Sequence, residues 1–311
     1  MSTFWLIMII LSGIGFLAVI LYFASNLFFY YLSLSRRSIT RRIIQIYLKK
    51  HYKQFKFDFE WFEKKKSIVL SQRSRDGHLL IAKYYKRKDE NKLAIVCHGY
   101  GADYREMGMY AKYFYNRGYS VLLPHFRAHG ESEGKTIGMG WPDRLDLKKW
   151  IKYMVKNNPE CKIVLFGLSM GASTVCMTSG EHLPKNVKCI ISDCGYANAY
   201  DQFAFVATKL KVNPKIVMKM YNNFLTKIYG INLKKYDAVK QVEKAKVPML
   251  FIHGTKDEFV PYENLQKLYE AHPGPYKEKH EFVGAEHAMS YPTYEEEYKK
   301  VLGDFLKKYF N

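Results

Sequence analysis

Residues 162–172 read KIVLFGLSMGA, an apolar run that leads into Gly167-Leu168-Ser169-Met170-Gly171. The run before the first glycine predicts a buried strand, and the residues from about Met170 onward predict a helix. A Gly-x-Ser-x-Gly pattern between a strand and a helix is typical of a sharp turn that exposes the serine hydroxyl at the strand's end. The small residues two positions before and two positions after the serine let the strand and the helix approach each other closely. This stretch therefore predicts that Ser169 stands at the carboxyl end of a strand.

The chain around this turn alternates short apolar runs with helical patterns. Strands are predicted at 67–73, 78–86, 92–97, 119–123, 162–166, 189–192, 247–252 and 280–283. Helices are predicted at about 104–116, 143–155, from 170 onward, 263–271 and 294–309. This alternation predicts an α/β fold with a mostly parallel central sheet and helices on both faces. Asp76-Gly77 predicts a hairpin between the first two strands, which adds an antiparallel edge.

The alternation stops between Cys194 and Lys246, where helical patterns follow one another. We interpret residues 195–246 as an inserted helical cap that closes over a binding cleft at the carboxyl ends of the strands. The cap holds ten lysines against three acids, a net charge of +7. Its aromatic residues include Phe203, Phe205, Tyr221, Phe224 and Tyr229. A basic and aromatic cap suits a lipid-derived or anionic acyl substrate.

Two polar residues complete a candidate catalytic set with Ser169. Where a nucleophilic serine stands on such a turn, an Asp or Glu and then a His follow it in the chain. Asp257 lies on the loop after the predicted strand 247–252, and His287 lies on the loop before the last predicted helix. We expect His287 to take the proton of Ser169 and Asp257 to hold the imidazole. Asp193, after the strand 189–192, is an alternative for the acid.

An oxyanion formed at Ser169 needs two backbone amide donors. Met170, the residue after the serine, is expected to supply one. The loop His98-Gly99-Tyr100-Gly101 follows the predicted strand 92–97, and we assign the second amide to Tyr100. We interpret His98 as support for this turn. Three further histidines lie near strand ends and are candidates for lining the site: His125, His129 and His253.

The N-terminus reads as a membrane segment. Residues Phe4–Phe23 carry no charge and are enough to cross a hydrocarbon core of about 30 Å as a helix. A cleaved signal peptide fits less well, because no basic residue precedes Phe4 and the apolar run is long. We predict a retained transmembrane anchor over residues 1–34, with Tyr30 and Tyr31 in an interfacial aromatic belt.

Basic residues are concentrated directly after this segment. From Arg36 to Lys66, eleven Lys and Arg residues stand against three acids, a net charge of +8. The positive-inside rule places the body in the cytoplasm, and the basic stretch is expected to attract anionic lipid headgroups. The whole chain has a net charge of +20, but we find no nucleic-acid-binding signature, so no nucleic-acid partner is expected.

The five cysteines, Cys97, Cys161, Cys176, Cys189 and Cys194, form no CxxC pair. Most lie in apolar runs, which predicts buried free thiols and favours a reducing compartment. The spacing also gives no structural zinc site, because such a site needs closely paired ligands.

With these residues in view, the chain over about 67–310 resembles the α/β-hydrolase superfamily. More narrowly it is similar to bacterial serine hydrolases of the esterase and prolyl-oligopeptidase-like branches. The stretches that carry the resemblance are CHGYGADYREM, FRAHGESEG, GLSMGAST, ISDCGYANAYDQF, LFIHGTKDEFVP and GAEHAMS. One departure is His125, where many relatives carry Asp, and it puts the geometry of the loop 124–134 in question.

The resemblance implies hydrolysis of an ester, thioester or amide through an acyl-enzyme, with no metal or organic cofactor. We expect a small-molecule or lipid-derived carboxylic ester or thioester as the substrate. The alternatives are a serine peptidase of the same fold and, with less support, a non-catalytic membrane-tethered binding protein. The predicted division is an anchor at 1–34, a basic juxtamembrane segment at 35–66 and an α/β-hydrolase domain at 67–311 that contains the cap.

Overall fold

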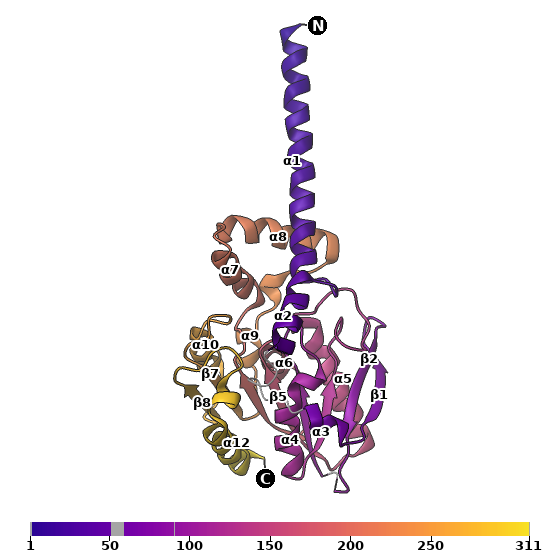
Figure 1. The fold of residues 1–311 in the computed structure, drawn as a ribbon, viewed down its shortest axis with the longest axis vertical. Coiled ribbons are helices and arrows are strands. Elements are labelled where there is room, and N and C mark those ends of the chain that lie inside the picture. The colour runs from indigo at the N-terminus through magenta and orange to yellow at the C-terminus, as the bar shows by residue number, and fades with distance from the viewer. Residues whose placement is uncertain (1, 51–58, 90, 311) are drawn as a thin grey trace.

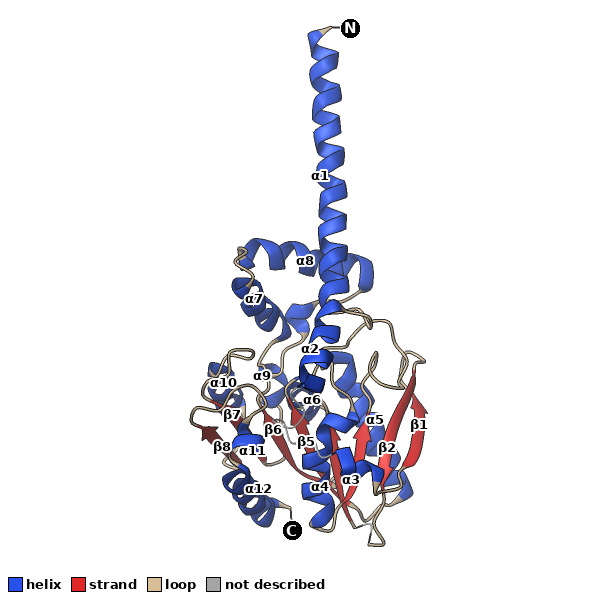
Figure 2. Ribbon diagram, viewed as in Figure 1, coloured by secondary structure: helices blue, strands red, loops and turns tan. Residues whose placement is uncertain are grey.

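A mixed eight-stranded sheet lies at the centre of the protein in this computed structural model, which describes residues 2–50, 59–89 and 91–310 (Figures 1 and 2). The strands are β1 (Ile68–Arg73), β2 (Leu79–Tyr85), β3 (Lys92–Cys97), β4 (Ser120–Pro124), β5 (Lys162–Leu168), β6 (Val187–Asp193), β7 (Met249–Gly254) and β8 (Lys277–Phe282). Their order in the sheet is β1-β2-β4-β3-β5-β6-β7-β8. β1 and β2 are antiparallel to their neighbours, and the other strands are parallel. The predicted fold class is confirmed, including the antiparallel edge.

Helices cover both faces of the sheet. One face carries α5 (Trp141–Asn157), α6 (Met170–Ser179) and α10 (Glu263–Ala271), and the other carries α4 (Gly108–Asn116) and α12 (Glu295–Tyr309). Residues of β5 alternate between the two cores, since Ile163 and Leu165 pack on the first and Val164 and Phe166 on the second. Both sets are fully buried, which explains why this strand reads as a continuous apolar run.

The segment between β6 and β7 is helical, as the cap prediction required. It contains α7 (Ala199–Lys209), α8 (Pro214–Tyr229), the short η2 (Leu233–Lys235) and α9 (Val239–Val242). Asn198 and Asn213 cap α7 and α8 by accepting backbone N–H bonds in the first turn. Gly230 ends α8 in the left-handed conformation. In Figure 1, α7 and α8 stand off the body beside the lower part of the N-terminal helix.

That N-terminal helix, α1, runs without interruption over Thr3–Ser33. At 1.5 Å per residue its 31 residues span about 46 Å. The polar pair Ser25-Asn26 does not break it, because both side chains donate hydrogen bonds back to the Tyr22 carbonyl. Among the described helices α1 is the one long and apolar enough to cross a membrane, and residues 2–21 are all exposed.

The lower end of α1 differs from the prediction of an interfacial aromatic belt. Tyr31 is exposed, but Tyr30 is only 4% exposed. The Tyr30 ring stacks on Tyr229 at 4.2 Å, and its hydroxyl lies 2.6 Å from Thr136 Oγ1. Tyr30 therefore packs against the body, and the apolar pattern of residues 27–34 reflects packing against protein as well as exposure to lipid.

The basic stretch is also partly engaged with the body. It includes α2 (Ile39–Lys50) and α3 (Phe59–Glu63), and residues 51–58 lie outside the described ranges. Arg36 donates to the carbonyls of Ser132 and Gly130 at 2.6 and 2.8 Å, and Arg41 donates to the Ala128 carbonyl at 2.7 Å. These two guanidinium groups hold the loop 124–134 and are not free for lipid headgroups. The division of the chain at residues 34 and 66 stays a prediction.

Candidate active site

Ser169 sits at the turn between β5 and α6, as the opening motif predicts. Its φ of 55° and ψ of −117° lie in a region that residues other than glycine rarely adopt. A Cβ at Gly167 would collide with the Gly171 carbonyl, and one at Gly171 would collide with the Cys97 carbonyl. The two glycines are therefore required by close backbone approach, and the strain at Ser169 is held by the strand and helix on either side.

His287 joins Ser169 to Asp257 through hydrogen bonds. His287 Nε2 lies 2.9 Å from Ser169 Oγ, and His287 Nδ1 lies 2.7 Å from Asp257 Oδ2. Asp257 follows β7, and His287 lies on the loop between β8 and α11 (Ser290–Thr293). The sequence therefore placed all three residues in elements whose ends converge. The arrangement permits proton transfer from Ser169 to His287, with Asp257 fixing the ring.

Asp257 is held as a carboxylate by several donors. Its Oδ1 accepts the backbone N–H groups of Phe259 and Val260 at 2.9 and 2.8 Å. Its Oδ2 lies 3.1 Å from Nε2 of His253, a buried residue near the end of β7. Burial would raise the pKa of Asp257, but the two imidazoles outweigh it and hold the pKa well below its usual range. An ionised Asp257 accepts from His287 Nδ1–H, which leaves Nε2 free to accept the Ser169 proton.

Asp193, the alternative acid, has another partner. Its Oδ2 accepts the Tyr298 hydroxyl at 2.7 Å in the interior of the protein. Burial raises the pKa of Asp193 to about 7, since the Tyr298 hydrogen bond offsets only part of the desolvation. Within the described residues, the acid hydrogen-bonded to His287 is Asp257.

The loop after β3 and the start of α6 present two backbone amides beside Ser169. Within the described part of the chain, the N–H groups of Tyr100 and Met170 have no hydrogen-bond acceptor. The neighbouring Gly101 N–H, in contrast, donates to His129 Nε2 at 3.2 Å. A Cβ built on Gly99 would lie 3.4 Å from Ser169 Cβ, so this loop passes close to the hydroxyl. Both predicted amides are therefore available for an oxyanion.

Three buried histidines, His98, His125 and His129, brace the loop after β3 and the loop 124–134, and they do not line the cavity at Ser169. His98 Nε2 accepts the Phe126 N–H at 3.1 Å, which agrees with the structural role predicted for it. His125 Nδ1 accepts the Glu131 N–H at 2.9 Å, and its ring stacks on Tyr104. His125 thus organises the loop 124–134 at the position where the resemblance led us to expect an Asp. Burial lowers the pKa of His98, His125 and His129, which favours the neutral form of each ring.

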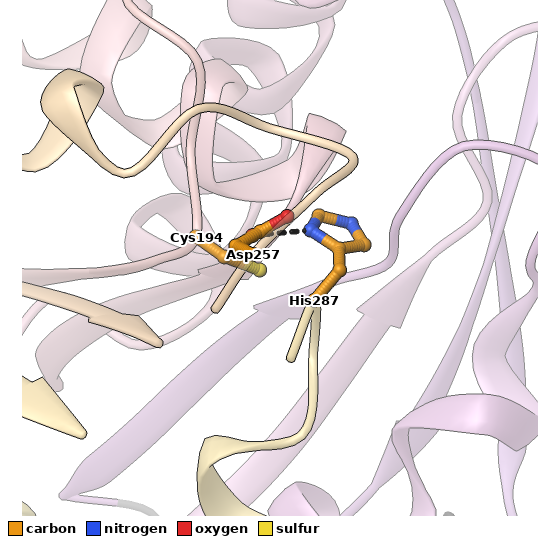
Figure 3. Close-up of side chains that lie close together, drawn as sticks. All are labelled: Cys194, Asp257 and His287. Carbon is orange, nitrogen blue, oxygen red and sulfur yellow. Dashed lines mark hydrogen bonds and ion pairs between the residues drawn. The ribbon is translucent and has the colours of Figure 1, made fainter. Parts of the chain in front are cut away.

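Figure 3 shows Cys194 beside Asp257 and His287, and their thiol, carboxylate and imidazole atoms lie within 4.8 Å of one another. Such a trio is also a candidate metal site. Both His287 nitrogens, however, are already engaged with Asp257 and Ser169. Burial raises the pKa of the Cys194 thiol well above its usual range, whereas metal ligation requires a thiolate. The donor set fits proton transfer better than metal binding. The other four cysteines are also free and buried, as predicted.

A cavity of about 130 Å³ opens onto Ser169, Met170 and Tyr100. Cap residues form much of its wall, including Gln202, Phe203, Val206 and Leu210 from the α7 region. All its described lining residues are uncharged. The site therefore combines a serine hydroxyl, an imidazole and two free amides with an apolar chamber.

Residues 88–235 and 206–291 match the family model described as "Serine aminopeptidase, S33". The chain belongs to this family. The match spans the loop after β3, the turn at Ser169, Asp257 and His287, so the family assignment and the site geometry rest on the same segments. The α/β-hydrolase superfamily assignment made from the sequence is confirmed.

Similar proteins extend the comparison to most of the chain. A Bacillus subtilis protein, the uncharacterized YqkD, is 28% identical over 250 residues, covering 80% of this chain and 82% of its own length. An esterase of Pyrococcus furiosus superposes with a TM-score of 0.65 at 26% identity, covering 80% of this chain and 93% of that one. An acylaminoacyl peptidase of Pyrococcus horikoshii superposes with a TM-score of 0.58 at 17% identity over 78% of this chain and 41% of that one, which shows the shared fold. A hydrolase is therefore supported, but the esterase and peptidase neighbours leave the reaction open.

Sequence reasoning missed two features of the site. His253 was noted as a possible lining residue, but it supports Asp257. The sequence feature that could have indicated this role is the position of His253 near the end of β7, four residues before Asp257. The contribution of α1 to the cavity, through Phe29, Leu32 and Ser33, had no sequence signal.

Proposed function

We propose that this protein is a membrane-anchored serine hydrolase that cleaves a carboxylic ester or thioester through an acyl-enzyme. The observation that carries the proposal is the hydrogen-bonded series Ser169, His287 and Asp257 opening onto an apolar cavity. The family assignment and the similarity to an esterase support the same reaction class.

The geometry suits two successive acyl transfers. Ser169 Oγ attacks the carbonyl carbon while His287 Nε2 takes its proton, and the amides of Tyr100 and Met170 stabilise the oxyanion. His287 then returns the proton to the departing alcohol or thiol as its bond to the acyl carbon breaks. A water molecule then attacks the acyl carbon while His287 Nε2 takes its proton. As the bond between the acyl carbon and Ser169 Oγ breaks, His287 returns this proton to Oγ, which releases the carboxylic acid and restores the hydroxyl. Each step uses side chains and backbone amides of this chain and needs no metal or organic cofactor.

The lining of the cavity favours an ester or thioester over an aminopeptidase substrate. A free N-terminal ammonium group is held in proteins by carboxylates or carbonyl oxygens, since burying it unpaired is costly. The described residues that line the cavity include no Asp or Glu. A serine peptidase of the same fold stays the second candidate because the family name and the peptidase neighbour point to it.

The membrane assignment rests on α1 and on the residues that follow it. Its exposed apolar surface fits a single-pass anchor, and Arg36, Arg37, Arg41 and Arg42 after it favour a cytoplasmic body. We expect membrane lipids to be partners of this helix and of the exposed part of the basic stretch.

The test compares detergent-purified wild type with Ser169→Ala and with Ser71→Ala, an exposed serine on edge strand β1. Each protein is incubated separately with a fluorophosphonate label, with p-nitrophenyl esters of increasing acyl length and with an aminoacyl p-nitroanilide. We expect wild type and Ser71→Ala to label and hydrolyse the esters, and Ser169→Ala to lose a factor of about a thousand or more. Faster anilide than ester turnover would favour the peptidase. Wild-type activity in Ser169→Ala would remove Ser169 from the mechanism, and an inert wild type would favour a binding protein.

A further inference from the structure

The N-terminal helix forms one wall of the cavity that opens onto Ser169. Phe29, Leu32 and Ser33 of α1 line it opposite cap residues such as Val206 and Met218. A membrane anchor that only tethered the body would have no reason to contribute to the substrate chamber. In this chain the chamber is incomplete without α1.

This wall is fixed by contacts on two sides. Toward the cap, Ser33 Oγ lies 3.0 Å from the Tyr221 hydroxyl, and the Phe29 ring lies 6.0 Å from the Tyr221 ring. Toward the body, the Tyr100 hydroxyl donates a hydrogen bond to the Ser33 carbonyl. Tyr100 also supplies one of the two free amides beside Ser169, so a single residue joins the helix to the reaction centre.

The far end of the cavity has an exposed apolar rim. Leu210 and Val212, in the turn between α7 and α8, line the cavity while 54% and 36% exposed. Ile216 and Met220 continue this exposed apolar surface along α8. Contiguous exposed apolar surface of this kind is typical of a membrane or partner contact.

The rim lies beside the membrane segment. Tyr22, at the end of the uncharged run Phe4–Phe23, donates its hydroxyl to the Met220 carbonyl at 3.4 Å. Figure 1 shows α8 beside the lower part of α1. Four exposed lysines surround the rim, Lys209, Lys211, Lys215 and Lys219. Apolar residues flanked by lysines are typical of a surface that rests in the headgroup layer of an anionic bilayer.

We infer that the cavity binds the acyl chain of a bilayer lipid ester, which enters from the membrane between α1 and the rim formed by Leu210 and Val212. The acyl chain lies against Phe29 and Leu32, and the ester carbonyl reaches Ser169. This inference rests on the proposed hydrolase function and names its substrate class. A water-soluble ester would not require a site whose wall is the anchor and whose opening is apolar.

The wall is tested by Leu32→Trp in the full-length chain, with Leu27→Trp as the matched control. Leu27 lies on the same helix, is 41% exposed and does not line the cavity. The measurement is the ratio of kcat/KM for a dodecanoyl and an acetyl p-nitrophenyl ester, counted per fluorophosphonate-labelled site, so that misfolded molecules do not contribute. We expect Leu32→Trp to lower this ratio about tenfold, because excluding two methylene groups from an apolar site has this effect. The ratio in Leu27→Trp should match wild type.

Entry from the bilayer is tested by Leu210→Glu, with Val69→Glu on edge strand β1 as the control; Val69 is 54% exposed. Wild type and variants are placed in vesicles of phosphatidylcholine and phosphatidylglycerol. They are labelled either with a hexadecyl fluorophosphonate embedded in the vesicles or with a short soluble one. We expect Leu210→Glu to lower the ratio of embedded to soluble labelling rates about tenfold or more, because a carboxylate at the rim opposes contact with anionic lipid.

The outcomes separate this inference from the proposed function. If Leu32→Trp and Leu210→Glu change their ratios no more than their controls, the bilayer-facing site is wrong although the hydrolase stands. If the wild type neither labels nor hydrolyses any ester, the hydrolase itself is wrong and the inference is overturned with it.

Discussion

His253 Nε2 and Asp257 Oδ2 lie 3.1 Å apart, and this is the carboxylate oxygen that also contacts His287 at 2.7 Å. His253 is 1% exposed and also lies 3.1 Å from the Val260 carbonyl. The candidate acid is therefore fixed by a second, buried imidazole in addition to the one that faces the serine. In the interior such a network orients the carboxylate more firmly than the loop backbone alone.

Replacing His253 with Ala should lower kcat about tenfold with little change in KM, because the acid loses a positioning donor but the cavity is intact. A structural role alone would lower the fraction of labelled sites and leave kcat per labelled site unchanged. The measurement is therefore kcat normalised to fluorophosphonate-labelled enzyme. His280→Ala on β8, a half-buried histidine that lies outside the site and pairs with Glu297 at 2.8 Å, serves as the control.

The strands and the serine–histidine–aspartate set were predictable because each depends on local pattern. Apolar runs of strand length, the Gly-x-Ser-x-Gly turn and the chain order of acid and base are all visible in consecutive residues. Ser169, Asp257 and His287 converge because a parallel sheet brings the carboxyl ends of its strands to one edge.

The contacts of the N-terminal helix were not predictable in the same way. A tyrosine at the end of a membrane segment looks the same in sequence whether it faces lipid headgroups or, like Tyr30, packs on another residue such as Tyr229. Arg36 and Arg41 look like lipid-binding charges in sequence, yet backbone carbonyls of the loop 124–134 take their donors. These pairings join residues about 90 to 200 positions apart, and side-chain type alone does not determine such partners.

Two glycine substitutions in helices should change stability in opposite directions. Gly171→Ala forces a Cβ against the backbone carbonyl of Cys97, which cannot move without displacing β3, so we expect a loss of about 2 kcal/mol or more. Gly303→Ala in α12 meets no atom closer than 3.8 Å and should stabilise the protein by about 0.5–1 kcal/mol. Thermal unfolding of both variants and wild type in detergent measures the difference. If Gly171→Ala were as stable as wild type, the collision of its Cβ with the Cys97 carbonyl would be contradicted.

The loop 124–134 should depend on a largely buried ion cluster. Arg127 donates to Asp146 at 2.9 and 3.0 Å and to Asp76 at 2.7 Å, and its side chain is only 10% exposed. Arg127→Met leaves the buried Asp146 carboxylate without its cation, and we expect a loss of about 3–5 kcal/mol of unfolding free energy. Arg105→Met removes a pair in which the guanidinium is 59% exposed and Asp103 is 14% exposed, so it should cost less than the loss of Arg127. Urea unfolding midpoints compare the two, and equal losses would contradict a buried cluster at Arg127.

Asp193 should make stability depend on pH in a predictable direction. Burial raises its pKa to about 7 in the folded state from an ordinary value near 4. The folded protein therefore binds more protons than the unfolded chain between these values. Asp193 contributes its full stability below about pH 4, and this contribution is lost as the pH rises toward 7, by at most about 1.4 kcal/mol per pH unit.

The substitution Asp193→Asn isolates this contribution, because the amide oxygen keeps an acceptor for Tyr298 but does not ionise. We expect the unfolding free energy of the variant to rise relative to wild type as the pH increases from 5 to about 7, and the difference to level off above it. Urea unfolding of both proteins at several pH values measures it. A control with Asp201→Asn, an exposed acid on α7, should show no such trend. If the difference between wild type and Asp193→Asn were constant across this range, Asp193 would have to be ionised in the folded protein, and a cation or water would have to reach it.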